Sequence, residues 1–357
     1  MRAQGNNFSF NGQSIYIGID VHKKSWSVDI ITQSGYREHF TQESKAEVLL
    51  SHLQKRYKGG NYYSVYESGF TGFSTHYSLV NLGINNIIVN AADVPISQKE
   101  MLHKSDKVDA KRLASSLKAG KLQGIYIFDK EELAFREMVR VRSTLVKENT
   151  RCKNRIQSCL FRQGIDLSNE FPTGQSHWSA RFIDRLKEIA ASSCPSLSYY
   201  IDSYLREREA LVNHTKDLRN FCKEEKYAQK IDLLMSIPGI GFITSIVFLS
   251  EIGNIDRFKN ERSFASFIGI VPTCHDSGEK KTNGEMTFRT NKYLSRCLIE
   301  SSWVAIRTDF ALAACYGELC KRMNSNDAII RIARKLSNRI LAVLKKKEKY
   351  EFGKNNQ

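Results

Sequence analysis

The segment 14–23 constrains the fold more than any other part of the sequence. Isoleucines alternate with other residues from Ile15 to Ile19, which is the period-two pattern of a β-strand. No charged residue interrupts this run before Asp20. A carboxylate at the end of a buried strand is costly unless a cation compensates it. The segment therefore predicts both a buried strand and a cation near its end.

Three further carboxylates occupy comparable positions. Glu67 ends the apolar run 62–66, and Asp106 and Asp109 open a helix after the strand 87–89. The two aspartates are one helical turn apart and share a face. Taken alone, they suit an N-cap and a first turn, where the helix dipole favours negative charge. Together with Asp20 and Glu67, they favour a site for a divalent metal.

The chemistry of these side chains indicates the ion and the substrate. Carboxylate oxygens are ligands for Mg²⁺ or Mn²⁺, and metal ions at such a site can flank a phosphate. Lysines lie close in sequence to the acids at Lys23, Lys104 and Lys107. They fit a phosphate-bearing substrate better than a small apolar one.

The order of predicted elements gives the fold class of the first domain, residues 1–128. Three strands come first, and helices then alternate with strands. This order predicts an α/β domain with a mixed sheet. A dinucleotide-binding fold alternates strand and helix from the start, so it is excluded. The predicted strands are 15–21, 26–30, 36–40, 62–66, 84–90 and 125–127, and the predicted helices are 43–57, 70–82 and 108–119.

Two helical regions follow. Residues 129–225 contain two long helical stretches, 131–163 and 197–223, with a short helix near 180–190, and they predict an antiparallel arm. Each long stretch has a narrow apolar seam that needs a partner from the same chain or another. Residues 226–357 form a helical domain with an irregular segment at 270–288. Its first two helices meet at the turn 237–241, which either binds phosphate through backbone N–H groups or is an ordinary helix–helix turn.

The charge balance indicates a polyanionic partner. The chain has 357 residues, a formal net charge of +16 and a pI near 9.4, which favours nucleic acid. The basic tail includes Lys345, Lys346 and Lys347. The longest near-apolar run, 240–250, is much shorter than the ~20 residues of a membrane helix. Eight cysteines without a C-x-x-C pair indicate reduced thiols in the cytoplasm.

Ser277 lies in a polar loop before a glycine. On its residue type alone it is a turn residue, since a nucleophilic serine needs an activating base or metal. The residues around Ser277 add some support for a role as a nucleophile. Lys280, Lys281 and Arg289 could hold a phosphate, and His275 could move a proton.

Two sets of motifs resemble one known family. The first set is 17–23 (Ile-Gly-Ile-Asp-Val-His-Lys), Glu67-Ser68 and 104–110 (Lys-Ser-Asp-Lys-Val-Asp-Ala). It resembles the amino-terminal half of the DEDD-type insertion-sequence transposases of the insertion-sequence one-ten family, relatives of the pilin-gene invertases. The second set resembles the carboxy-terminal half, in the same order, and comprises 237–241, Glu251-Ile252-Gly253, Phe258, 267–272 and Ser277-Gly278.

The resemblance implies a fold and a reaction. It implies an RNase H-like (RuvC-like) domain in which Asp20, Glu67, Asp106 and Asp109 bind the metal. It also implies a helical domain whose loop serine, Ser277, attacks DNA and forms a covalent phosphoserine link. The partners implied are double-stranded donor and target DNA and a structured noncoding guide RNA, the bridge RNA. Dimers that pair into a tetramer on DNA are implied as well, in the nucleoid of a prokaryotic cytoplasm.

One departure and two alternatives remain open. Where the family often has a second serine or a small residue before the nucleophile, this chain has Asp276, whose charge could slow attack on phosphate or hold a metal or a lysine. The first alternative is a metal-dependent nuclease, such as a junction resolvase, in which the acids activate water and Ser277 is idle. The second is a non-catalytic RNA-binding protein with this fold.

Overall fold

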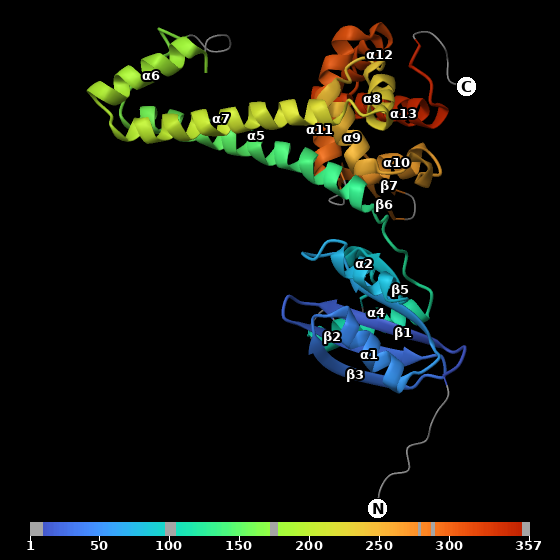
Figure 1. Cartoon of the computed structure of the whole chain (residues 1–357). Coiled ribbons are helices and arrows are strands. Elements are labelled where there is room, and N and C mark those ends of the chain that lie inside the picture. The colour runs from blue at the N-terminus through green and yellow to red at the C-terminus, as the bar shows by residue number, and fades with distance from the viewer. Residues whose placement is uncertain (1–9, 97–104, 172–177, 278–279, 287–289, 352–357) are drawn as a thin grey trace, which may run out of the picture. The chain divides into compact units, whose positions relative to one another are not determined.

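The computed structural model describes residues 10–96, 105–171, 178–277, 280–286 and 290–351, with backbone only for 272–277 and 280–286. The chain divides into two compact units, Met1–Phe128 and Asp129–Gln357 (Figure 1). The first unit contains a five-stranded sheet and the second is mainly helical. Each unit is described by itself.

The sheet of the first unit is mixed. Its strands are β1 (Ser14–Val21), β2 (Ser25–Thr32), β3 (Arg37–Glu43), β4 (Asn61–Glu67) and β5 (Asn85–Val89), in the spatial order β3-β2-β1-β4-β5. The first three strands form an antiparallel meander, and β4 and β5 are added parallel to β1. This is the strand order of an RNase H-like sheet, so the predicted fold class is confirmed.

Helices cover both faces of this sheet (Figure 1). The alternating isoleucines of β1 pack with Leu49 and Leu53 of α1 (Ala46–Arg56) and Leu79 of α2 (Ser74–Asn81). The opposite face packs against α4 (Asp106–Lys118), with a short turn η1 (Ala91–Asp93) before it. Because successive side chains of a strand point to opposite faces, Gly18 and Asp20 lie on the face toward α4.

The last strand predicted for this unit, 125–127, is wrong. Residues 121–129 have no regular secondary structure. The segment still follows the edge of the sheet, because the Ile125 amide donates to the Ile88 carbonyl of β5 at 2.8 Å. One backbone hydrogen bond anchors a chain without making a ladder, and short apolar triplets do not distinguish these two cases.

The second unit begins with a long antiparallel helix pair. The helices α5 (Lys130–Arg162) and α7 (Ser196–Phe221) lie side by side, and α6 (Ala180–Ser192) packs at their far end (Figure 1). A capping box between Asp129 and Glu132 starts α5. The apolar seam predicted for the stretch 131–163, which consists of Val141, Leu145, Cys152, Ile156 and Cys159, is only partly correct. Cys152, Ile156 and Cys159 are buried, but Val141 is 45% exposed because two helices alone do not enclose its position.

Shorter helical segments form the core at the base of this pair. They are α8 (Glu225–Met235), α9 (Phe242–Ile252), η2 (Ile255–Arg257), α10 (Glu261–Ile268), α11 (Lys292–Thr308), α12 (Phe310–Cys320) and α13 (Ser325–Lys346). The turn between α8 and α9 packs against α11. A Cβ on Gly239, which has φ +85°, would lie 2.5 Å from the Ser301 carbonyl oxygen. The glycine of this turn therefore has a packing role.

The segment between α10 and α11 is a hairpin rather than irregular. Its strands are β6 (Pro272–Ser277) and β7 (Lys280–Met286), paired antiparallel with Ser277 opposite Lys280. The prediction of irregular structure was wrong, because these polar strands lack the apolar alternation that signals a strand in sequence. Among the described helices, none has the length and apolar content needed to cross a membrane.

Candidate active site

Strand register brings the first two acids together. Ile19 of β1 pairs with Tyr66 of β4 in parallel, so the next residues, Asp20 and Glu67, stand at the same end of neighbouring strands. Glu67 shares its face with Val65, whose side chain packs with Leu113 of α4. Both carboxylates therefore lie on the face that α4 covers. A polar side chain at this point avoids full burial because the strands end here.

The start of α4 supplies the other two acids. Ser105 caps the helix, and its hydroxyl accepts from the Val108 amide at 3.4 Å. Asp106 and Asp109 occupy the first turn, where the helix dipole stabilises carboxylates. The helix approaches β1 very closely at Gly18, which brings its first turn to the end of the strand. The four acids of the sequence prediction are therefore gathered at one edge of the sheet.

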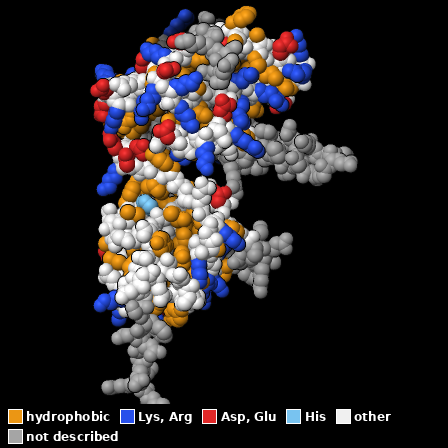
Figure 2. Space-filling view, turned by 90° about the vertical axis from the view of Figure 1, so that its right-hand side faces the viewer, with side chains coloured by type: hydrophobic (Ala, Val, Ile, Leu, Met, Phe, Trp, Pro, Cys, Tyr) orange, Lys and Arg blue, Asp and Glu red, His pale blue; other side chains and the backbone are white. Residues whose placement is uncertain are grey.

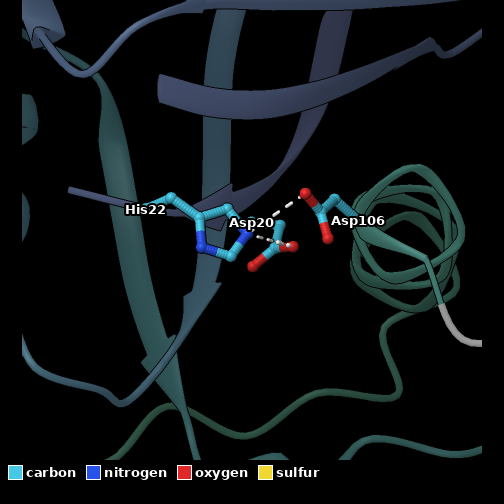
Figure 3. Close-up of side chains that lie close together, drawn as sticks. All are labelled: Asp20, His22 and Asp106. Atoms are coloured by element: carbon cyan, nitrogen blue, oxygen red, sulfur yellow. Dashed lines mark hydrogen bonds and ion pairs between the residues drawn. The ribbon is translucent and has the colours of Figure 1, made fainter. Parts of the chain in front are cut away.

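An imidazole links one pair of these acids. The Nε2 atom of His22 lies 3.2 Å from Asp20 Oδ2 and 3.3 Å from Asp106 Oδ2 (Figure 3). One potential ligand atom from each of the three residues lies within 4.8 Å of the others. The side chains of His22 and Asp106 are 49% and 66% exposed. Solutes can therefore reach this half of the cluster.

A guanidinium links the other pair. Arg112 Nη2 donates to Glu67 Oε1 at 3.1 Å and lies 2.9 Å from Asp109 Oδ1. The Arg112 side chain is only 9% exposed, so its charge is held in place by packing. His22 thus contacts one pair of carboxylates, Asp20 and Asp106, and Arg112 contacts the other pair, Glu67 and Asp109. This arrangement reduces the repulsion among the acids.

The pKa of Asp20 reflects its crowded position. Burial raises it above the ordinary value of 3.8, and the nearby negative charges of Asp106 and Asp109 raise it further. His22 acts in the opposite direction, through its charge and its hydrogen bond, but does not cancel the burial. A raised pKa means that the ionised form lacks sufficient stabilisation from the protein itself. A bound cation would supply that stabilisation.

The donor set fits a divalent metal ion. Carboxylate oxygens are the ligands that Mg²⁺ and Mn²⁺ take from proteins. Asp109 Oδ1 is buried, and although Arg112 Nη2 lies 2.9 Å away, it accepts no well-directed hydrogen bond from the residues that the structure describes. A buried carboxylate oxygen without a directed donor is costly, and coordination of a cation would satisfy it. Asp20, Glu67, Asp106 and Asp109 are thus able to hold the ion.

The structure describes only some of the residues predicted to contact phosphate. Lys23 and Lys107 are exposed in the first unit, near Asp20 and Asp106 in sequence. Lys345 donates to the Phe258 carbonyl at 2.6 Å, and Lys346 and Lys347 are exposed beyond it. Lys104 and Arg289 lie outside the described residues, as do the side chains of His275, Asp276, Ser277, Lys280 and Lys281.

Basic side chains are nevertheless abundant on the second unit. On the face in view, Lys and Arg side chains are spread among acidic ones rather than gathered in a single stripe (Figure 2). Such a surface attracts a polyanion over a wide area.

Three residues of evident importance have no role assigned from the sequence, although His22 and Glu251 lie within the two sets of motifs. His22 follows Asp20 by two positions, the spacing of one strand face, and Arg112 follows Asp109 by one helical turn. Both spacings were available as signals. Glu251 is different: it is 1% exposed and accepts from Arg136 and Arg140 of α5, which are 115 and 111 positions away. No local pattern predicts such a pair.

The comparisons with known proteins agree with this geometry. Residues 17–163 match the family model of a DEDD transposase of IS110 type, and residues 231–317 match the model described as "Transposase IS116/IS110/IS902 family". The two matches together span about two thirds of the chain; the first covers most of the sheet unit and all of α5, and the second lies within the helical unit. The chain belongs to the IS116/IS110/IS902 family of transposases. It is a transposase of an insertion sequence, an enzyme that acts on DNA.

Curated relatives support this assignment along most of the transposase. It is 26% identical over 302 residues to the transposase of insertion sequence element IS1533 from Leptospira borgpetersenii, covering 82% of this chain and 85% of the relative. It is 25% identical over 264 residues to the transposase of IS1111A from Coxiella burnetii, covering 70% and 69%. The DEDD domain of this family implies the use of a divalent metal, which agrees with the four acids described above.

Proposed function

We propose that the transposase recombines DNA by metal-assisted cleavage and rejoining, with Ser277 as the nucleophile and a noncoding RNA as its guide. The observation that carries the metal part is the convergence of Asp20, Glu67, Asp106 and Asp109 at one edge of the sheet. Mg²⁺ or Mn²⁺ would be held by these four carboxylates. A bound ion would polarise the scissile phosphate and stabilise charge on the oxygens that enter and leave.

The residues of the chain have distinct tasks in this reaction. The four acids position the ion, and Arg112 keeps Glu67 and Asp109 in place before it binds. Lys23 and Lys107 attract the DNA backbone, and Lys104 does the same from the segment before α4. In the second unit, Ser277 lies opposite Lys280 in the register of β6 and β7, and Lys280, Lys281 and Arg289 would neutralise the phosphate.

The chemical step balances without an external energy source. The Ser277 hydroxyl loses its proton and its oxygen bonds to the scissile phosphorus. The bond from phosphorus to the 3′-oxygen breaks, and that oxygen leaves as a 3′-hydroxyl after taking up a proton. Attack of a 3′-hydroxyl on the phosphoserine reverses these events and rejoins the strands. One phosphodiester is exchanged for another throughout, so the bond energy is retained.

The partners of the reaction follow from the same proposal. The RNA guide is supported by the motif resemblance and by the net charge of +16, and it would pair with donor and target DNA. A second copy of the chain would supply the complementary unit, so that serine and carboxylates of one site come from different protomers. The long pair α5 and α7 supports a dimer contact, since Val141 and Val212 are 45% and 58% exposed along it. We place the complex on the nucleoid in the cytoplasm.

Trapping of covalent DNA tests the proposal. End-labelled donor DNA with a nick that blocks rejoining is incubated with protein, RNA and Mg²⁺, and label is counted on denatured protein. Wild type should retain label, while Ser277→Ala should neither cut nor trap but still bind RNA. Asp20→Ala should lose cutting and trapping in the same way, and EDTA should abolish both in wild type.

Each failure has a separate meaning. If wild type cuts DNA but never traps label, water is the attacking group and the protein is a nuclease of the resolvase type. If Ser277→Ala still traps label, another residue is the nucleophile. If label is trapped equally without RNA, the guide is not required. If RNA is bound but no DNA is cut under any condition, the protein is a non-catalytic RNA-binding protein.

A further inference from the structure

We propose that His22 is a ligand of the metal ion and that its imidazole makes the site prefer a transition-metal ion such as Mn²⁺ over Mg²⁺. This inference rests on the proposed metal-dependent function and adds a nitrogen to an all-oxygen ligand set. It also divides the cluster into a half where the ion enters, formed by Asp20, His22 and Asp106, and a half that Arg112 occupies before the ion binds. The four family acids do not by themselves imply either feature.

Distances within the first half support ligation. His22 Nε2 lies 3.2 and 3.3 Å from the Oδ2 atoms of Asp20 and Asp106. Neighbouring ligand atoms of an octahedral ion with bonds of ~2.1 Å stand ~3.0 Å apart. The imidazole nitrogen therefore lies at nearly the spacing of adjacent corners of such a shell from each of the two oxygens, and one ligand atom from each of the three residues lies within 4.8 Å of the others. All three side chains point to a common centre (Figure 3).

Chain geometry explains why this spacing arises. Asp20 ends the strand face that α4 covers, and His22 follows two positions later, where a strand would return to the same face. Asp106 reaches the pair from the first turn of α4. This half of the cluster is accessible to solvent, because the side chains of His22 and Asp106 are 49% and 66% exposed, so a hydrated ion can reach it.

The opposite half is less suited to an ion. There, Arg112 Nη2 lies 3.1 Å from Glu67 Oε1 and 2.9 Å from Asp109 Oδ1. A divalent ion placed between these two carboxylates would meet a guanidinium that packing holds in position. Coulomb repulsion at such a distance is large in a partly buried site. An entering ion should therefore first meet Asp20, His22 and Asp106, and Glu67 and Asp109 should join its ligands only as Arg112 moves away.

The nitrogen ligand determines the metal preference. Mg²⁺ is a hard ion that takes oxygen ligands and keeps several waters. First-row transition ions accept imidazole, and their affinity for nitrogen-containing sites rises along the series that begins with Mn²⁺. A site that adds one imidazole to its carboxylates should thus bind Mn²⁺ more tightly than Mg²⁺, and the difference should depend on His22.

The test measures metal binding rather than recombination. The full-length protein is titrated with Mn²⁺, followed by electron paramagnetic resonance, and with Mg²⁺ as a competitor. Pulsed spectra report nitrogen that is bonded directly to Mn²⁺. Wild type should show this nitrogen signal, and His22→Asn should lose it together with about tenfold in Mn²⁺ affinity. Its Mg²⁺ affinity should change little.

A matched variant controls for loss of a histidine beside a carboxylate. His52→Asn removes an imidazole that lies 3.3 Å from Glu38 in the same unit, and it should keep the wild-type signal and affinity. A nitrogen signal that persists in His22→Asn would overturn the inference, as would an unchanged ratio of Mn²⁺ to Mg²⁺ affinity. Asp20→Asn separates the two proposals. Undiminished Mn²⁺ binding by that variant would remove the metal site of the proposed function itself.

Discussion

Gly18 and Ala110 bring strand β1 and helix α4 into direct backbone contact. A Cβ built on Gly18 would lie 2.1 Å from the Ala110 carbonyl oxygen and 2.5 Å from the Ala114 amide nitrogen. Only glycine permits this approach. The contact is two residues before Asp20 and one residue after Asp109, so it fixes the distance between strand and helix where the acids meet.

Gly18→Ala should therefore damage the active site and the fold together. The added methyl meets backbone atoms rather than a flexible side chain, so α4 must move away from β1. We expect a loss of about 3 kcal/mol or more in the free energy of unfolding, at the upper end for overpacking. Chemical denaturation measures it. Gly241→Ala is a suitable control, because no atom lies within 4 Å of an added Cβ there, and it should change the free energy of unfolding little. Gly72→Ala is unsuitable, because the φ of +55° at Gly72 strains any residue with a side chain. Equal stability of Gly18→Ala and wild type would contradict the close approach.

Arg112→Met should make the stability of the fold depend more strongly on bound metal. Without the guanidinium, Glu67 and Asp109 lose their fixed partner, and the free energy of unfolding in EDTA should fall by about 1–3 kcal/mol. A divalent ion then no longer competes with Arg112, so added Mn²⁺ should raise Tm more than in wild type. Arg56→Met, which removes an exposed partner of Glu38, is the matched control. The prediction fails if Mn²⁺ shifts Tm equally in both variants and wild type.

Glu251→Gln should destabilise the second unit. The carboxylate accepts from Arg136 and Arg140 of α5 and from Asn291 at the start of α11, at 2.7–3.2 Å. Its loss takes this counter-charge away from two partly buried arginines, which costs about 3–5 kcal/mol. Glu318→Gln, in the exposed pair with Lys321, should unfold close to wild type. Similar unfolding midpoints for the two variants would show that the Glu251 cluster does not hold these helices together.

The same carboxylate predicts a pH dependence. Burial alone would raise the pKa of Glu251, but hydrogen bonds and charges from Arg140 and Arg136 outweigh it, so the net pKa lies below the ordinary 4.5. A carboxyl whose pKa is lower in the folded state stabilises the fold above the unfolded pKa. That stabilisation is lost as pH falls from about 4.5 through the folded pKa. Wild type should lose stability across this window, and Glu251→Gln should lose less, as followed by urea denaturation at each pH.

Lys346 and Lys347 should contribute to nucleic-acid binding through their positive charges. Both are exposed at the end of α13, and Lys345 before them donates a hydrogen bond to the Phe258 carbonyl. Changing both to Gln should reduce the slope of log K against log salt by roughly 0.9 for each phosphate of duplex DNA that the protein no longer neutralises. Lys187→Gln, an exposed lysine of α6 paired with Asp184, offers a comparison on the arm. An unchanged slope would remove the tail from the binding surface.

Local patterns predicted the sheet unit well because its elements obey local rules. The alternation of Ile15, Ile17 and Ile19 requires a strand with one apolar face, and this face packs on α1 and α2. The same alternation places Asp20 on the other face. Ser105 and the two aspartates after it match the start of a helix. Each of these signals depends on neighbours within about one turn or two strand positions.

The sequence by itself thus determined the fold class, the order of β1 to β5 and the helices that follow them in the first unit, and the identity of four acids at element ends. It did not determine that His22 joins Asp20 and Asp106, that Arg112 lies between Glu67 and Asp109, or that Glu251 holds α5 to α9. Nor did it distinguish the hairpin at 272–286 from an irregular loop. Only the tertiary structure decided these pairings, because an ion pair or a ladder forms wherever packing brings charges and backbones together, at sequence separations that no local period encodes.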